Sequence, residues 1–165
     1  MSRIRPDQLL VPSILDRLLD EEPDALSEPV KSRSQRLRDL KLSVRRDLEN
    51  LLNSRCGLRV LPPDAEHLGT SVLNYGIPDL GGLTMSSREQ RENLRRRVED
   101  VIRKFETRFK SGRVELVRDE RDVVKRTIRF KIDGLLHAEP APEPVAFESQ
   151  VSAVIGEFRV QAAEA

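Results

Sequence analysis

The stretch KRTIRFKIDGLL, residues 125–136, decides the fold of this chain. Apolar and charged side chains alternate along it, in the order Ile128, Arg129, Phe130, Lys131, Ile132 and Asp133. A period of two places successive side chains on opposite faces of a strand. The stretch therefore predicts a strand with one face in a core and the other in solvent.

Similar patterns lie on both sides of this strand. GRVELVRD (residues 112–119) places Val114 and Leu116 on one side, and the short connection to residue 125 predicts an antiparallel hairpin. After the proline-rich residues 139–144, VAFESQV (residues 145–151) and IGEFRVQ (residues 155–161) alternate again. Four such segments predict an antiparallel sheet of about four strands.

Two helices are expected before the sheet. Residues 32–54 carry apolar side chains at steps of three and four, with Ser32 or Ser34 as the cap: Leu37, Leu40, Val44, Leu48, Leu51 and Leu52. Residues 86–105 show the same spacing, and Ser86 with Glu89 fits a capping box. The predicted class is α+β, with N-terminal helices packed on a C-terminal antiparallel sheet.

The chain is expected to form one domain and an arm. Residues 1–31 combine an apolar segment with the acidic, proline-containing DEEPDALSEP (residues 20–29), which is typical of an arm and a linker. Residues 32–165 are then a single domain. The apolar arm needs burial, either against its own domain or against a partner.

Composition limits the function classes. The 165 residues hold 29 basic and 28 acidic side chains, with a basic middle and acidic ends. This distribution favours several charged neighbours over one polyanion. The single cysteine, Cys56, permits no internal disulfide, and no apolar run is long enough for a signal peptide or a membrane span. We therefore expect a cytoplasmic protein.

Few residues suggest chemistry. His67, His137 and Cys56 have no partners at metal-ligand spacing, and GGLTMSS (residues 81–87) lacks the lysine of a phosphate-binding loop. Paired carboxylates could serve a sugar hydrolase, but one tyrosine and no tryptophan provide little aromatic platform. We expect no catalytic residue, metal or cofactor. A peptidoglycan muramidase and a nucleic-acid-binding protein that uses the basic helices remain the alternatives.

The segment FETRF (residues 105–109) raises a separate question. In extended chain, Glu106 and Arg108 point to the same side, between two phenylalanines. The pair is either a local salt bridge, worth about 0–1 kcal/mol if exposed, or a docking element for another protein. The residues alone leave both open.

Five phrases in sequence carry a family resemblance. They are RDLENLLNSR (46–55), SVLNYGIPD (71–79), IRKFETRF (102–109), IRFKIDGLL (128–136) and EPVAFESQV with GEFRV (143–160). In this order and spacing the chain resembles the TssE family of baseplate wedge subunits of the type VI secretion system, from about residue 12 to residue 160. This family is related to the contractile-phage wedge proteins once labelled lysozyme-like.

The resemblance implies a function without catalysis. It implies a cytoplasmic baseplate at the inner membrane complex, with TssF, TssG and TssK as neighbours, and the start of a sheath made of TssB and TssC. The family's Glu-Pro-Arg signature, which docks on the wedge core, maps to Glu106, Thr107 and Arg108, with threonine replacing proline. The family's loop phrase maps to Asn74, Tyr75, Gly76 and Asp79.

The last strand is the candidate contact with the sheath. Addition of a partner strand requires a sheet edge with unpaired N–H and C=O groups. GEFRVQ (residues 156–161) has one glutamate, one arginine and no proline to protect it. We therefore expect the hairpin of residues 145–161 at or near a sheet edge, with the backbone of Phe158, Arg159 and Val160 as the candidate edge that meets the sheath. The alternative is that the hairpin only closes the core, with Val145, Phe147, Phe158 and Val160 as packing residues.

Overall fold

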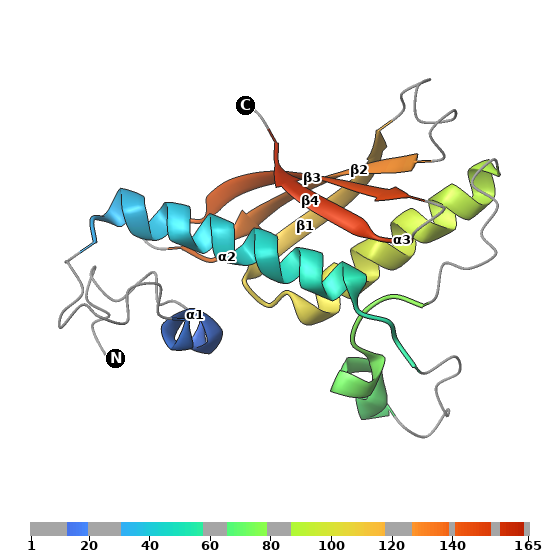
Figure 1. Ribbon diagram of the computed structural model, residues 1–165, viewed down its shortest axis with the longest axis horizontal. Coiled ribbons are helices and arrows are strands. Elements are labelled where there is room, and N and C mark those ends of the chain that lie inside the picture. Colours follow the sequence, from blue (N-terminus) through green and yellow to red (C-terminus); the bar gives the residue numbers. More distant parts are fainter. Residues whose placement is uncertain are drawn as a thin grey trace.

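The computed structural model describes residues 13–19, 31–57, 66–78, 87–117, 127–138, 141–152 and 156–163. Helices precede the sheet, so the predicted α+β class is confirmed (Figure 1). The elements are α1 (Ile14–Leu18), α2 (Arg33–Asn53), the 3-10 helices η2 (Glu66–Thr70) and η3 (Val72–Asn74), α3 (Arg88–Phe105), β1 (Phe109–Val117), β2 (Thr127–Leu136), β3 (Glu143–Ser152) and β4 (Phe158–Ala162).

The sheet has four antiparallel strands in the order β1-β2-β3-β4. Strand β2 contains the alternating stretch, and Ile128, Phe130 and Ile132 are buried as predicted. In β3 the buried positions also alternate, through Val145 and Phe147. Because each strand pairs with its sequence neighbour, the described strands form a meander with β1 and β4 at its two edges.

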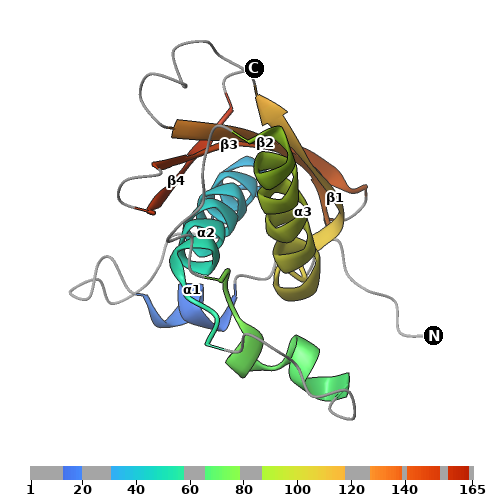
Figure 2. The ribbon, with the colours of Figure 1, turned by 90° about the vertical axis from the view of Figure 1, so that its right-hand side faces the viewer.

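Helices α2 and α3 lie side by side on one face of the sheet, as Figure 2 shows. Helix α2 packs near β4, and α3 packs near β1. Ser32 caps α2 in a capping box with Gln35. The predicted box at Ser86 and Glu89 is wrong by one residue, because α3 begins at Arg88 and its cap is Ser87, which accepts from the backbone N–H of Gln90; Ser86 lies outside the described residues.

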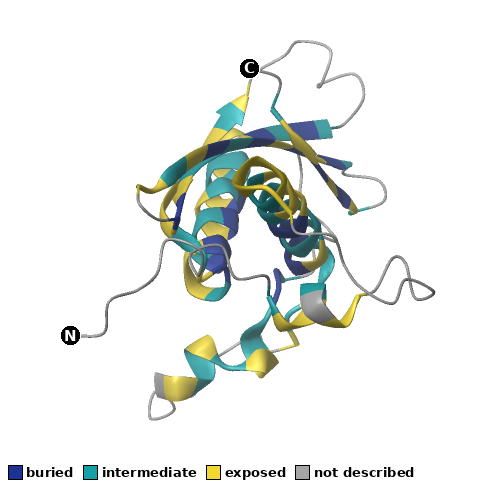
Figure 3. Ribbon diagram, turned by 90° about the vertical axis from the view of Figure 1, so that its left-hand side faces the viewer, coloured by how far each residue is buried: buried dark blue, intermediate teal, exposed yellow. Residues whose placement is uncertain are grey.

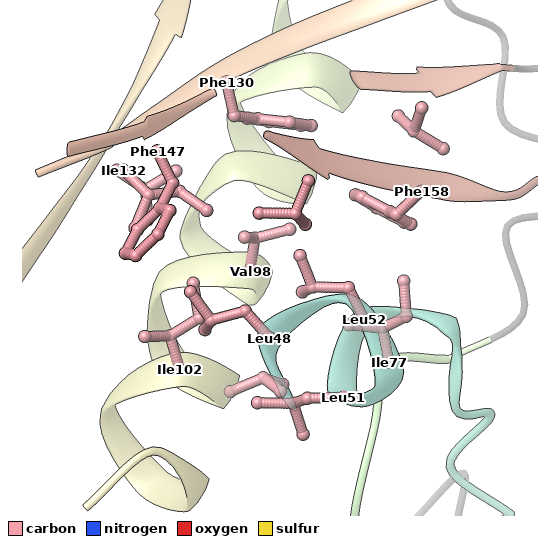
Figure 4. Packing of buried hydrophobic residues seen from close by; sticks show 14 of the residues in the cluster. Leu48, Leu51, Leu52, Ile77, Val98, Ile102, Phe130, Ile132, Phe147 and Phe158 are labelled. Atoms are coloured by element: carbon pink, nitrogen blue, oxygen red, sulfur yellow. The ribbon is translucent and has the colours of Figure 1, made fainter. Parts of the chain in front are cut away.

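The core fills the layer between the helices and the sheet. Figure 4 shows Leu48 and Leu52 of α2 and Val98 of α3 packed beneath Phe130 and Phe158. The rings of Phe130 and Phe158 stack with their centroids 6.2 Å apart. In Figure 3, buried residues alternate with more exposed ones along β2 and β3, as expected for a sheet with one face covered by the helices. Among the described residues, the structure contains no helix of the length and apolarity that a bilayer crossing requires.

Candidate docking site

The FETRF segment forms a tight turn between α3 and β1. Glu106 ends α3, with its N–H donating to the carbonyl of Ile102 at 2.9 Å. The N–H of Phe109 donates back to the carbonyl of Glu106 at 3.2 Å, so Thr107 is the second residue of a β-turn and its side chain is exposed. Proline is favoured at this position. A proline at residue 107 would therefore suit the same turn as the threonine of this chain.

Glu106 and Arg108 point to the same side and pair with each other. Arg108 Nε donates to Glu106 Oε1 at 2.7 Å, and Arg108 Nη2 donates to Glu106 Oε2 at 2.6 Å. The backbone N–H of Arg108 adds a third bond to Oε1. This bidentate geometry is the strong form of a guanidinium–carboxylate contact.

The pair faces the protein's own helix α2. Arg108 Nη2 also donates to Asp47 Oδ2 at 2.8 Å, and Nη1 donates to Ser43 Oγ at 3.0 Å. The side chain of Glu106 is only 6% exposed and that of Arg108 is 23% exposed. The pair is therefore a largely buried ion pair, and not the exposed salt bridge that was one of the two alternatives. Burial lowers the pKa of Arg108, but Glu106 and Asp47 outweigh burial and raise it.

The arm helix α1 joins the same network. Ser43 Oγ donates to Asp16 Oδ2, and Arg46 Nη2 donates to Asp16 Oδ1, each at 2.7 Å. Burial raises the pKa of Asp16, but hydrogen bonds from Ser13, Ser43 and Arg46 outweigh it and lower the pKa from 3.8 to about 2. Because the folded-state pKa of Asp16 lies below its unfolded-state value, the ionised carboxylate of Asp16 stabilises the fold above about pH 4. This stabilisation is lost as the pH falls toward 2.

An open cleft of about 490 Å³ lies beside the turn. It is lined by the apolar residues Leu15, Leu51, Tyr75 and Phe105 and by the polar residues Asp47, Asn50, Glu106 and Arg108. Thr107 lines it as well. The cleft therefore brings together the arm, α2, the NYG loop and the FETRF turn.

The NYG loop is fixed against the end of α2. The N–H of Ile77 donates to the carbonyl of Ser54, and the N–H of Cys56 donates to the carbonyl of Ile77. Asn74 holds the loop from within, through a bond from its Nδ2 to the carbonyl of Gly69. Tyr75 contacts Phe105 edge to face, with ring centroids 5.3 Å apart.

Three of the four loop residues singled out from the sequence are described, and they have different roles. Tyr75 lines the cleft. Asn74 and Gly76 shape the loop, Gly76 with a φ of 96°. Asp79 lies outside the described residues.

The outward backbone of β4 is occupied by side chains of α2. Asn53 bonds to both the N–H and the carbonyl of Phe158, at 2.8 and 2.9 Å. Glu49 accepts from the N–H of Val160, and Arg45 donates to its carbonyl. The three helix residues are spaced by four, so they project from one face of α2. Their side chains take the hydrogen-bonding positions that a neighbouring strand would otherwise occupy. The expectation of an unprotected backbone at Phe158 and Val160 is therefore wrong.

Arg159 has the opposite orientation. The N–H of Ala163 donates to Ala146 of β3, and Arg159 lies four residues before Ala163 in the same register. Hydrogen-bonded pairs alternate along an antiparallel ladder. The N–H of Arg159 therefore points to Gln150 inside the sheet, while its side chain is exposed. Phe158 and Val160 place their side chains in the core.

The residues that sequence reasoning missed come from α2 and α1. Asp47, Ser43 and Asp16 complete the network around Arg108. Ser43 and Asp47 are one helical turn apart, which was visible in the sequence, but nothing there separated them from the other polar residues of α2. Within the described residues, no group of three His, Cys, Asp or Glu side chains could hold a metal ion.

Comparison with known families gives these features a context. Residues 38–141, from α2 to just before β3, match the family model described as baseplate wedge protein gp25. The match places the protein in the class of structural components of a contractile-machine baseplate. The chain belongs to the baseplate wedge protein gp25 family. Comparisons with curated proteins and with solved structures gave no match.

Proposed function

We propose that this protein is a TssE-type wedge subunit of a type VI secretion baseplate. It acts without catalysis in the cytoplasm, in a baseplate assembled against the inner membrane complex. The wedge family of residues 38–141 supports the baseplate role. The phrases NYGIPD and FETRF, together with the order of the other shared phrases, support the secretion-system branch of that family.

Docking on the wedge core through the FETRF turn is the first part of the function. The observation that carries it is the position of Thr107, exposed at the lip of a cleft of about 490 Å³. The ion pair of Glu106 and Arg108 fixes this turn against α2, through the bonds of Arg108 to Ser43 and Asp47. A rigid turn beside a cleft is preorganised for a partner, which reduces the entropy lost on binding. TssF, TssG and TssK are the proposed partners.

A bulky residue at the lip tests this docking. We expect Thr107→Trp to leave the free energy of unfolding within about 0.5 kcal/mol, because the site is exposed. The same change should weaken binding to a purified TssF–TssG complex at least about tenfold, measured by biolayer interferometry. Glu148→Trp, on the exposed face of β3, is the matched control and should bind normally. Equal binding by both variants would remove the docking role.

Contact with the sheath proteins TssB and TssC is the second part. Strand β4 is at the edge of the described sheet, and side chains rather than a strand occupy its outward groups. A partner strand could replace these side-chain bonds with backbone bonds. The edge also continues to Ala162, whose N–H points away from β3 by the same alternation.

Two prolines on β4 test the edge. Ala162→Pro removes an outward N–H at an exposed position, so we expect less than about 1 kcal/mol of destabilisation and loss of TssB–TssC sheath assembly in a reconstituted system. Arg159→Pro removes an N–H inside the sheet and should destabilise the protein by about 2–3 kcal/mol, seen in urea unfolding. Normal sheath assembly with Ala162→Pro would show that β4 is not the pairing edge.

A further inference from the structure

Helix α1 presents its apolar side chains to solvent, whereas the side chain of Asp16 faces the protein. Ile14 is 79% exposed, Leu18 is 75% exposed, and Leu15 and Leu19 are about half exposed. Asp16, in contrast, contacts α2 through Ser43 and Arg46. A surface helix normally buries its apolar side. Four adjacent exposed apolar side chains of this size mark an interaction site.

Helix α1 contacts α2 through hydrogen bonds and an ion pair of Asp16. Ser13 and Asp16 form a capping box, so the carboxylate of Asp16 is held in place before it meets α2. The hydroxyl of Ser43 then uses both of its bonding capacities. It donates to Asp16 and accepts from Nη1 of Arg108. One buried hydroxyl thus connects the arm to the FETRF turn.

The exposed side of α1 continues into the cleft. Leu15 and Ser13 line the cleft together with Tyr75 and Phe105. The exposed apolar side chains of α1 therefore lie next to the apolar residues that line the cleft.

The charge of the network identifies the kind of partner. Among the described residues of this network, three carboxylates, Asp16, Asp47 and Glu106, face two guanidinium groups, Arg46 and Arg108, which leaves one net negative charge. A ligand with a positive charge suits this balance, because like charges close together are costly. An amphipathic helix that carries apolar side chains next to one lysine or arginine matches both the charge and the apolar walls.

We propose that α1 is one wall of the docking surface, and that the apolar face of α1 and the cleft together bind an amphipathic, basic helix of a wedge partner. This inference rests on the proposed docking function and extends its surface to the N-terminal arm. Ser43 positions both halves of the surface, because it contacts Asp16 on one side and Arg108 on the other. It is a positioning residue.

The test uses the full-length protein and the purified TssF–TssG complex. Ile14→Ser with Leu18→Ser should weaken binding about tenfold or more, because both side chains would be buried by the partner. The free energy of unfolding should not change, since both are exposed in the free protein. Val117→Ser, at an exposed apolar position of β1, is the control and should bind as the wild type does.

The outcomes separate this inference from the docking function. If Thr107→Trp blocks binding and the α1 variant binds normally, docking stands and the role of α1 is overturned. If neither change affects binding, the docking function itself fails. Tighter binding by the α1 variant would mean that this helix shields the cleft, which also overturns the inference.

The positioning role of Ser43 is tested by combination. We expect Ser43→Ala to weaken binding, and to add little to the loss already caused by the changes at Ile14 and Leu18, because all three act through the same contact. Fully additive losses would show that Ser43 does not act through α1, and would overturn the link.

Discussion

Alanine at Arg108 should destabilise the folded protein by about 3–5 kcal/mol, the cost of removing one partner of a buried ion pair. Arg108 donates to Glu106, Asp47 and Ser43. Without the guanidinium group, the carboxylate of Glu106 stays buried and keeps only a backbone N–H as a donor among the bonds described above. The loss should appear in urea unfolding as a lower midpoint with an unchanged slope.

Two variants show whether burial causes the loss. Arg113→Ala removes an exposed arginine that pairs with Glu115, and should cost less than about 1 kcal/mol. Glu106→Leu with Arg108→Met replaces both charges by apolar groups and should recover most of the stability, because it leaves no unpaired buried carboxylate at residue 106. A loss of stability for Arg108→Ala as small as that for Arg113→Ala would show that Arg108 does not keep its contacts with Glu106, Asp47 and Ser43 in solution.

The sequence predicted the parts of the fold that have a strict period. The alternation of Ile128, Phe130 and Ile132 identified β2, since a one-residue slip would have moved all three side chains to the solvent face. Short connections predicted that neighbouring segments pair, as the meander confirms. The spacing of Val44, Leu48 and Leu52 likewise identified the buried side of α2.

The site was harder to predict from the sequence, because it depends on contacts between residues that are distant in sequence. Local spacing showed that Glu106 and Arg108 share a side, but not that this side faces Asp47, 61 residues earlier than Arg108. An ion pair that faces inward has the same sequence as one that faces outward. The turn could therefore be located from the sequence, whereas its burial could not.

The edge of β4 shows the same limit. Its own residues contain few protecting features, and the protection comes instead from Arg45, Glu49 and Asn53 on α2. Polar side chains at a spacing of four are typical of a solvent-facing helix side. Only the packing of α2 beside β4 shows that these side chains bond to a strand.

Alanine at Gly76 should have an effect as large as alanine at Arg108, through the backbone. Gly76 has a φ of 96°, which side-chain-bearing residues rarely adopt. A Cβ there would lie 2.3 Å from the carbonyl oxygen of Ser54. That same oxygen accepts the bond from Ile77 that holds the NYG loop to α2. Backbone strain of about 1–3 kcal/mol and overpacking of about 1–3 kcal/mol together give an expected destabilisation of about 4 kcal/mol.

Gly57→Ala is the matched control for this prediction. Gly57 lies in the connection that follows α2, and a Cβ there would meet no atom within 4 Å. Its replacement should change stability by less than about 1 kcal/mol. Thermal unfolding of both variants measures the difference. If Gly76→Ala and Gly57→Ala unfold at the same temperature, the NYG loop does not pack closely against Ser54. If Gly76→Ala melts far lower, the loop holds Tyr75 against Phe105 at the cleft because glycine alone permits that approach.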